Sequence, residues 1–151
     1  MSEGDARPPR VLFVCGHNAG RSIAAEAIAR ATRGDELEVA SCGTYPSGKI
    51  NPAMQSALEE AGYSTSGLRS KGPDDPEVGG YAKWDLLVTM GCMDGQCPFA
   101  PGAATEDWGL PDPARDAGAV PLVIRAVEER VRALDPAAVR RRADPVNAEQ
   151  N

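Results

Sequence analysis

Short apolar runs alternate with segments of helical periodicity along most of this chain. Residues 11–14 form a continuous apolar run, which is typical of a strand that is buried on both faces. The segments 36–44 and 84–90 carry similar runs. We therefore expect them to form a second and a third strand.

Three helices are expected between and after these strands. The first ends at Gly34 and carries apolar residues at helical spacing, namely Ile23, Ala24, Ala27, Ile28 and Ala31. The second is marked by Asn51 as N-cap, Pro52 at the first helical position and Gly62 beyond its end. The third has the clearest apolar stripe, made of Val120, Ile124, Val127, Val131 and Leu134.

Strands that alternate with helices imply right-handed crossovers and a mostly parallel sheet. We therefore expect an α/β fold, with a parallel sheet of about four strands and helices on both faces. Residues 64–80, with at most one helical turn, and residues 91–119 are expected to be loops. In such folds the chemistry lies at the carboxyl edge of the strands.

The length of 151 residues allows one core of good size but is short for two ordinary domains. We expect a single domain over residues 10–135, which the motifs below make a catalytic domain. A flexible N-terminus, residues 1–9, precedes it, and a polar C-terminal tail, residues 136–151, follows it.

Composition narrows the classes of partner and compartment. The formal net charge of -6 argues against a nucleic-acid surface, although one local positive pocket still suits a small anion. The sequence carries neither an apolar signal segment nor a run of the ~18 apolar residues that a membrane span needs. We therefore expect a cytoplasmic protein, in which the four cysteines are catalytic, metal-binding or buried thiols.

The segment 14–22, VCGHNAGRS, joins the first strand to the first helix. Such a loop presents backbone N–H groups to its own centre, where the positive end of the helix dipole also points. Gly16 and Gly20 are expected to let the backbone curl without Cβ clashes, and Asn18 tolerates a left-handed conformation. The loop therefore predicts an oxyanion site built from residues 16–21, with His17 and Ala19 among its members.

The same segment supplies a nucleophile. The positive field favours the thiolate form of Cys15, and the planar guanidinium of Arg21 suits two oxygens of a tetrahedral anion. Ser22 is placed to donate a hydrogen bond to the sulfur. His17, the only histidine, is expected to serve the loop architecture rather than to act as a base or a zinc ligand.

Three further cysteines need a role. Cys92 and Cys97, separated by four residues and flanked by Gly and Pro, are interpreted as a redox pair, with half of a zinc site and idle thiols as alternatives. Zinc is disfavoured because no second ligand pair stands at metal spacing. Cys42 is interpreted as a small buried residue, although it too ends a strand and remains a competing resolving thiol.

A nucleophile that attacks a tetrahedral oxyanion needs an acid to protonate the departing oxygen. In the segment 106–114, EDWGLPDPA, Asp112 is the natural candidate because Pro113 holds it in an extended conformation. Asp107 and Glu106 remain rivals.

The segments 14–22, 89–98 (TMGCMDGQCP) and 106–114, in that order, resemble the arsenate reductases built on the low-molecular-weight protein tyrosine phosphatase fold. The similarity spans residues 10–135. It implies that Cys15 attacks arsenate, which Arg21 and the loop amides hold, and that Asp112 protonates the leaving oxygen. Such an enzyme serves arsenic resistance and detoxification, and weak phosphatase activity can accompany it.

The resemblance also implies a disulfide relay. Cys92 would attack Cys15, which releases arsenite, and Cys97 would then attack Cys92. The external reductant would be thioredoxin, or a low-molecular-weight thiol with a glutaredoxin-like partner.

No bound cofactor is implied, but a structural potassium ion is left open. Asn18, Glu26 and Ser41 match part of the potassium site of some relatives. Arg69 and Lys71 stand near it, so a resident basic side chain is the alternative to the ion.

Two rival functions remain at this stage. One is a phosphotyrosine phosphatase of the same fold, although Ala114 follows Asp-Pro where those enzymes typically show an aromatic residue. The other is a non-catalytic module that binds an anion and senses oxidation. We expect a monomer that binds arsenate or phosphate and contacts neither nucleic acid nor membrane.

Overall fold

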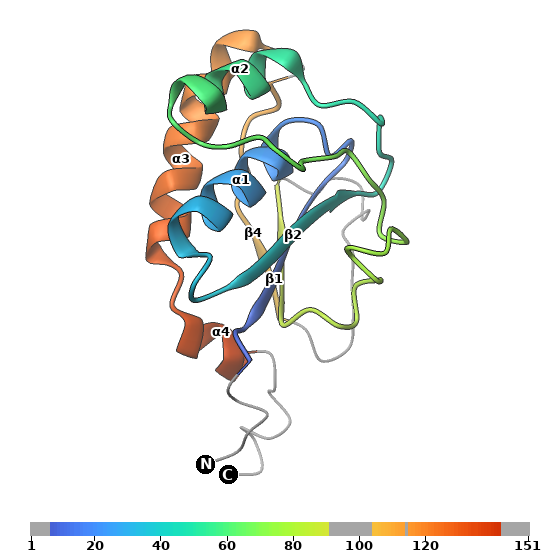
Figure 1. The fold of residues 1–151 in the computed structure, drawn as a ribbon, viewed down its shortest axis with the longest axis vertical. Coiled ribbons are helices and arrows are strands. Elements are labelled where there is room, and N and C mark those ends of the chain that lie inside the picture. The colour runs from blue at the N-terminus through green and yellow to red at the C-terminus, as the bar shows by residue number, and fades with distance from the viewer. Residues whose placement is uncertain (1–6, 91–103, 114, 143–151) are drawn as a thin grey trace.

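The computed structural model describes residues 7–90, 104–113 and 115–142 (Figure 1). Four strands, β1 (Arg10–Cys15), β2 (Glu38–Gly43), β3 (Leu86–Thr89) and β4 (Ala104–Asp107), form one sheet in the order β2-β1-β3-β4. Every strand pair is parallel. The α/β fold with a parallel sheet of about four strands is confirmed, and Cys15, at the end of β1, pairs in register with Gly43 at the end of β2.

Three of the helices agree with the sequence prediction: α1 (Arg21–Arg33), α2 (Pro52–Glu60) and α3 (Val120–Ala133), the last preceded by the short 3-10 helix η2 (Ala117–Ala119). Asn51 caps α2, since its Oδ1 accepts hydrogen bonds from the backbone N–H groups of Ala53 and Met54. Within the described residues, no helix combines the length and the apolar character that crossing a membrane requires.

The two faces of the sheet are covered differently. Alternate residues of β1 point to opposite sides, so that Val11 and Phe13 join one buried cluster with α1, α2 and α3, while Leu12 and Val14 join another. Figure 1 shows α1 and α3 together along the first face. Val78 and Trp84, from the segment between α2 and β3, complete the second cluster.

We expected helices on both faces, but in the described part of the chain an irregular segment covers the second one. Its physical reason is composition: Pro73 and Pro76 cannot continue a helix, and Gly79 and Gly80 adopt positive φ angles. The Trp84 indole N–H donates to the Val78 carbonyl at 2.8 Å, which fixes this cover without regular structure.

Strand β4 lies within the region 91–119 that the sequence predicted to be one long loop. Its four residues, Ala-Thr-Glu-Asp, are polar or small and alternate between half-buried and exposed, as an edge strand allows. Pairing with β3, from Leu86 opposite Ala104 to Thr89 opposite Asp107, makes it a strand. This pairing is not local, so hydrophobic periodicity missed it.

Part of the region predicted as a C-terminal tail is also regular. Residues 136–142 form helix α4 (Pro136–Arg142) instead of a frayed tail. Asp135 caps the helix, because its Oδ1 accepts from the N–H of Ala137, and Pro136 starts it. Val139 is 2% exposed and belongs to the same buried cluster as α3, so burial of one apolar side chain anchors this short helix.

Candidate active site

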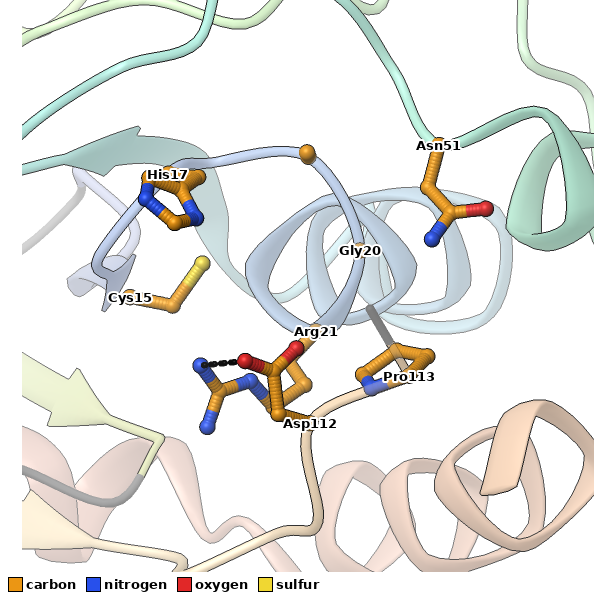
Figure 2. Close-up of a pocket in the computed structure, with 8 residues that line it drawn as sticks. Cys15, His17, Gly20, Arg21, Asn51, Asp112 and Pro113 are labelled. Atoms are coloured by element: carbon orange, nitrogen blue, oxygen red, sulfur yellow. Dashed lines mark ion pairs between the residues drawn. The ribbon is translucent and has the colours of Figure 1, made fainter. Parts of the chain in front are cut away.

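A pocket opens where β1 runs into α1, at the carboxyl edge of the sheet. Figure 2 shows the Cys15 sulfur, the Arg21 guanidinium and the Asp112 carboxylate gathered around it. These side chains come from two parts of the chain that lie 90 residues or more apart in sequence. The complete lining consists of Cys15, His17, Ala19, Gly20, Arg21, Asn51, Asp112 and Pro113.

The backbone of the loop divides its polar groups between protein and pocket. Its carbonyls are used by neighbouring segments: Gly16 O accepts from Tyr45 N, His17 O from Ser47 N, Ala19 O from Asn51 N, and Gly20 O from Ala24 N. The N–H groups of residues 16–21 donate to no acceptor in the part of the chain that the structure describes. Buried or half-buried N–H groups need a partner, and an anion in the pocket would provide it.

Close packing of the loop against β2 depends on Gly43. A Cβ atom on Gly43 would lie 2.6 Å from Gly16 O and 2.8 Å from Asn18 N, which no side chain tolerates. Asn18 has a φ of 50°, as its predicted left-handed tolerance requires. The steric argument fails for Gly16, since a Cβ there would meet nothing within 4 Å, whereas at Gly20 it would approach Pro113 Cγ to 3.0 Å.

The nucleophile candidate is held by Ser22. Cys15 is 9% exposed at the end of β1, and its Sγ lies 2.9 Å from the Oγ of Ser22 in the first turn of α1. Ser22 Oγ also accepts a hydrogen bond of 2.7 Å from Asn18 Nδ2. The predicted contact between Cys15 and Ser22 is therefore present.

Arg21 ties the pocket to two other segments. Its Nη1 donates to Met90 O at 2.6 Å and to Leu110 O at 3.3 Å. Its Nη2 lies 3.9 Å from Asp112 Oδ2, the ion pair that Figure 2 marks. The guanidinium is thus oriented across the pocket floor before any ligand arrives.

Among the three acid candidates, the geometry brings only Asp112 to the pocket. Glu106 accepts from the indole N–H of Trp108 at 2.7 Å, and Asp107 accepts from Thr89 Oγ1 at 2.6 Å. Neither of these two carboxylates lines the pocket, whereas Asp112 does and its side chain is 31% exposed.

Three lining residues bear on earlier expectations. His17 lies exposed at the mouth of the pocket, and its carbonyl accepts from Ser47 N and from Ser70 Oγ. The sequence predicted Asn51 only as a helix cap and Pro113 only as a residue that holds Asp112 in an extended conformation. Both also line the pocket. Asn51 N donates to Ala19 O, so the start of α2 also braces the loop.

Cys92 and Cys97 lie outside the described residues. The chain can be followed to Met90, which is 2% exposed, donates its N–H to Val14 O and receives the hydrogen bond from Arg21. Cys92 follows Met90 by two residues.

Cys42 is fully buried in the second cluster, on the opposite face of the sheet from α1. Burial raises the pKa of the Cys42 thiol to about 12, with the nearby Lys71 opposing the shift. A thiol in this environment stays protonated near neutral pH. It therefore fits the small buried residue that the sequence predicted, rather than a competing resolving thiol.

The residues that match part of a potassium site contact a side-chain cation of the protein itself. Glu26 is 1% exposed, accepts a hydrogen bond from Ser41 Oγ at 2.5 Å and lies 3.5 Å from the ammonium Nζ of Lys71. Asn18 Oδ1 already accepts from Lys71 N. A resident cation is therefore present beside Glu26. No group of three or more His, Cys, Asp or Glu in the described ranges could hold a metal ion.

Known proteins share this arrangement of sequence and fold. The sequence profile of the family described as low molecular weight phosphotyrosine protein phosphatase matches residues 10–144. The arsenate reductase of Bacillus subtilis is 36% identical over 111 residues, which is 72% of this chain and 76% of that protein. The glutaredoxin arsenate reductase of Synechocystis is 32% identical over 125 residues, covering 81% and 92%.

A solved structure shows the same likeness. The thioredoxin-dependent arsenate reductase of Corynebacterium glutamicum superposes with a TM-score of 0.65 at 34% identity. The superposition covers 86% of this chain and 62% of that one.

Proposed function

The chain belongs to the low molecular weight phosphotyrosine protein phosphatase family, and from that premise we propose that it is an arsenate reductase, which converts arsenate to arsenite. One observation carries the proposal most directly. The backbone N–H groups of residues 16–21 have no acceptor among the described residues, and Cys15 and Arg21 line the pocket at this loop. The relatives from Bacillus subtilis and Synechocystis described above are both named as arsenate reductases.

In the first step, Cys15 Sγ attacks arsenic and an S–As bond forms. One As–O bond breaks, and the oxygen leaves as water after protonation by Asp112. Asp112 lines the pocket beside Arg21, on the side where a bound arsenate would present its leaving oxygen. Ser22 stabilises the thiolate before attack.

In the second step, the Cys92 thiolate attacks Cys15 Sγ. A disulfide forms, the electron pair of the S–As bond passes to arsenic, and As(V) becomes As(III), which leaves as arsenite. Cys97 then attacks Cys92, frees Cys15 and leaves a Cys92–Cys97 disulfide. The carbonyl of Met90 accepts a hydrogen bond from Arg21, which lines the pocket. Cys92 follows Met90 by two residues, and two residues of chain span at most about 7 Å, which supports an approach of Cys92 to the pocket.

The reductant for the last disulfide is thioredoxin, or a low-molecular-weight thiol with a glutaredoxin-like partner. The relative from Corynebacterium glutamicum is named as thioredoxin-dependent, and the relative from Synechocystis is named as a glutaredoxin arsenate reductase. The cycle needs reduced cysteines at its start, so we place the protein in the cytoplasm. We also propose a monomer without a bound cofactor.

The assay that tests this function couples arsenate to NADPH. Arsenate-dependent NADPH oxidation with thioredoxin and thioredoxin reductase is expected, together with arsenite detected by chromatography. The same measurement with glutaredoxin, glutathione and glutathione reductase distinguishes the two reductants. Hydrolysis of p-nitrophenyl phosphate without any arsenate reduction in either system would instead support the phosphatase of the same family, which Cys15, Arg21 and Asp112 also suit.

A substitution at Cys92 tests the relay. Cys92→Ser is expected to release no arsenite above background, because attack on arsenate remains but the resolution of the S–As bond, which reduces arsenic, does not. Quenched samples of wild-type protein after one turnover should contain a Cys92–Cys97 disulfide, identified by peptide mass spectrometry. Normal multiple turnover of Cys92→Ser with thioredoxin would contradict the relay.

A further inference from the structure

Behind the oxyanion loop, a buried chain of hydrogen bonds runs from Cys15 to a pair of charges. The chain passes through Ser22, Asn18 and Ser41 and ends at the carboxylate of Glu26. All the connecting side chains are fully or almost fully buried. None of the steps of the proposed reaction uses the far end of this chain.

Two contacts, one at Glu26 and one at Lys71, fix the direction of the bonds in the chain. An ionised carboxylate only accepts, so the hydroxyl of Ser41 must donate to Glu26 Oε1. Ser41 Oγ then accepts from the Asn18 amide at 3.0 Å. The same amide group donates to Ser22 Oγ, while Asn18 Oδ1 accepts from Lys71 N, which fixes the orientation of the amide.

The consequence reaches the nucleophile. Because Ser22 Oγ accepts from Asn18, its single hydroxyl hydrogen is left to point at Cys15 Sγ, 2.9 Å away. A hydroxyl that donates to sulfur stabilises the thiolate, whereas one that accepts from it would stabilise the thiol. The orientation of the Asn18 amide therefore leaves a hydrogen-bond donor aimed at the Cys15 sulfur.

At the far end of the chain, Glu26 is 1% exposed and holds both Ser41 and Lys71. Two cations face it: the ammonium of Lys71, 3.5 Å from Oε1 in a side chain that is 3% exposed, and Arg30, 2.6 Å from Oε2 and half-exposed. An unpaired buried carboxylate is costly and takes up a proton. Lys71 is the cation that solvent cannot replace at this site.

We propose that Glu26 and Lys71 are positioning residues for the nucleophile: their ion pair holds Lys71 so that its backbone N–H orients the Asn18 amide, and this amide leaves the Ser22 hydroxyl hydrogen for Cys15. This inference rests on Cys15 being the nucleophile of the proposed function. It also gives a role to the residues that match part of a potassium site, since the Lys71 ammonium supplies a positive charge beside Glu26.

The test measures the alkylation of Cys15 by iodoacetamide at pH 7, quantified by peptide mapping, which needs no arsenate turnover. Lys71→Met removes the charge and is expected to slow alkylation about tenfold, the scale of one hydrogen bond to a charged acceptor. Lys71→Arg keeps the charge and should recover most of the rate. Lys83→Met, at an exposed lysine far along the chain from the loop, is the matched control and should react as wild type does.

Circular dichroism and a cooperative thermal transition establish that each variant is folded. If Lys71→Met does not fold, Glu26→Gln provides the measurement, since its neutral amide no longer holds the ammonium of Lys71, and the same slowing is expected. Wild-type alkylation should be equal in potassium chloride and choline chloride at matched ionic strength.

Three results would overturn the inference: a folded Lys71→Met that reacts at the wild-type rate, equal slowing in Lys71→Met and Lys71→Arg, or wild-type alkylation that accelerates specifically with potassium. Absence of arsenate reduction, with the alkylation results as expected, would refute the proposed function alone.

Discussion

Cys15→Ser is expected to reduce arsenite formation by at least about a thousandfold, to the background of the assay. A serine hydroxyl at this position is a far weaker nucleophile than a thiolate, and it cannot form the disulfide that passes electrons to arsenic. The loop N–H groups and Arg21 remain in place, so binding of phosphate, measured by titration calorimetry, should change by less than about tenfold. Arsenite is measured chromatographically under the coupled conditions.

Cys42→Ala is the matched control for this experiment. Cys42 lies one strand away from Cys15 but faces the other side of the sheet, where it is fully buried. Loss of its sulfur costs some packing, so the melting temperature should fall slightly while arsenate reduction stays near the wild-type rate. Turnover of Cys15→Ser above a few per cent of wild type would reject Cys15 as the nucleophile.

Local sequence was sufficient for most of the elements around the site. β1, α1 and the loop between them occupy residues 10–33 without interruption, and strand pattern, glycine content and helical periodicity change there within a few residues. The N-terminal cap of α2 could also be predicted from the sequence, since Asn51 and Pro52 act within one helical turn. Each of these features depends on neighbours in sequence.

The elements that escaped prediction depend on distant partners. β4 carries a polar sequence and exists because it pairs with β3, and α4 is anchored by one buried valine, Val139. The irregular cover of the second face follows from Val78 and Trp84 reaching the sheet from a Pro- and Gly-rich segment. No periodicity in these stretches reveals such contacts.

The same division applies to the site. Cys15, Ser22 and Arg21 lie within eight residues, so their roles could be inferred from spacing. The need for Gly43 comes from the loop after β1, whose Gly16 carbonyl oxygen would lie 2.6 Å from a Cβ at this position. The position of Lys71 comes from a chain of buried contacts. The only sign of this in the sequence was a glycine at the end of a buried strand, which does not reveal the segment that packs against it.

Arg21→Lys carries the second large effect, because charge alone does not replace the guanidinium. Arg21 donates to Met90 O, lies 3.9 Å from Asp112 and still presents donors to the pocket, which a single ammonium group cannot do at once. We expect kcat/KM for arsenate to fall about a hundredfold or more, through both a higher KM and a lower kcat. Steady-state kinetics over a range of arsenate concentrations measure both constants.

Arg33→Lys is the matched control, because Arg33 also donates from one Nη1 atom to two backbone carbonyls, those of Val131 and Arg132. Those carbonyls belong to the C-terminal turn of α3, away from the pocket, so the change should lower stability by about 1 kcal/mol or less and leave kcat/KM within about twofold. If Arg21→Lys behaved like Arg33→Lys, the planar fork would have no part in holding the oxyanion. The charge of the loop and its amides would then account for binding by themselves.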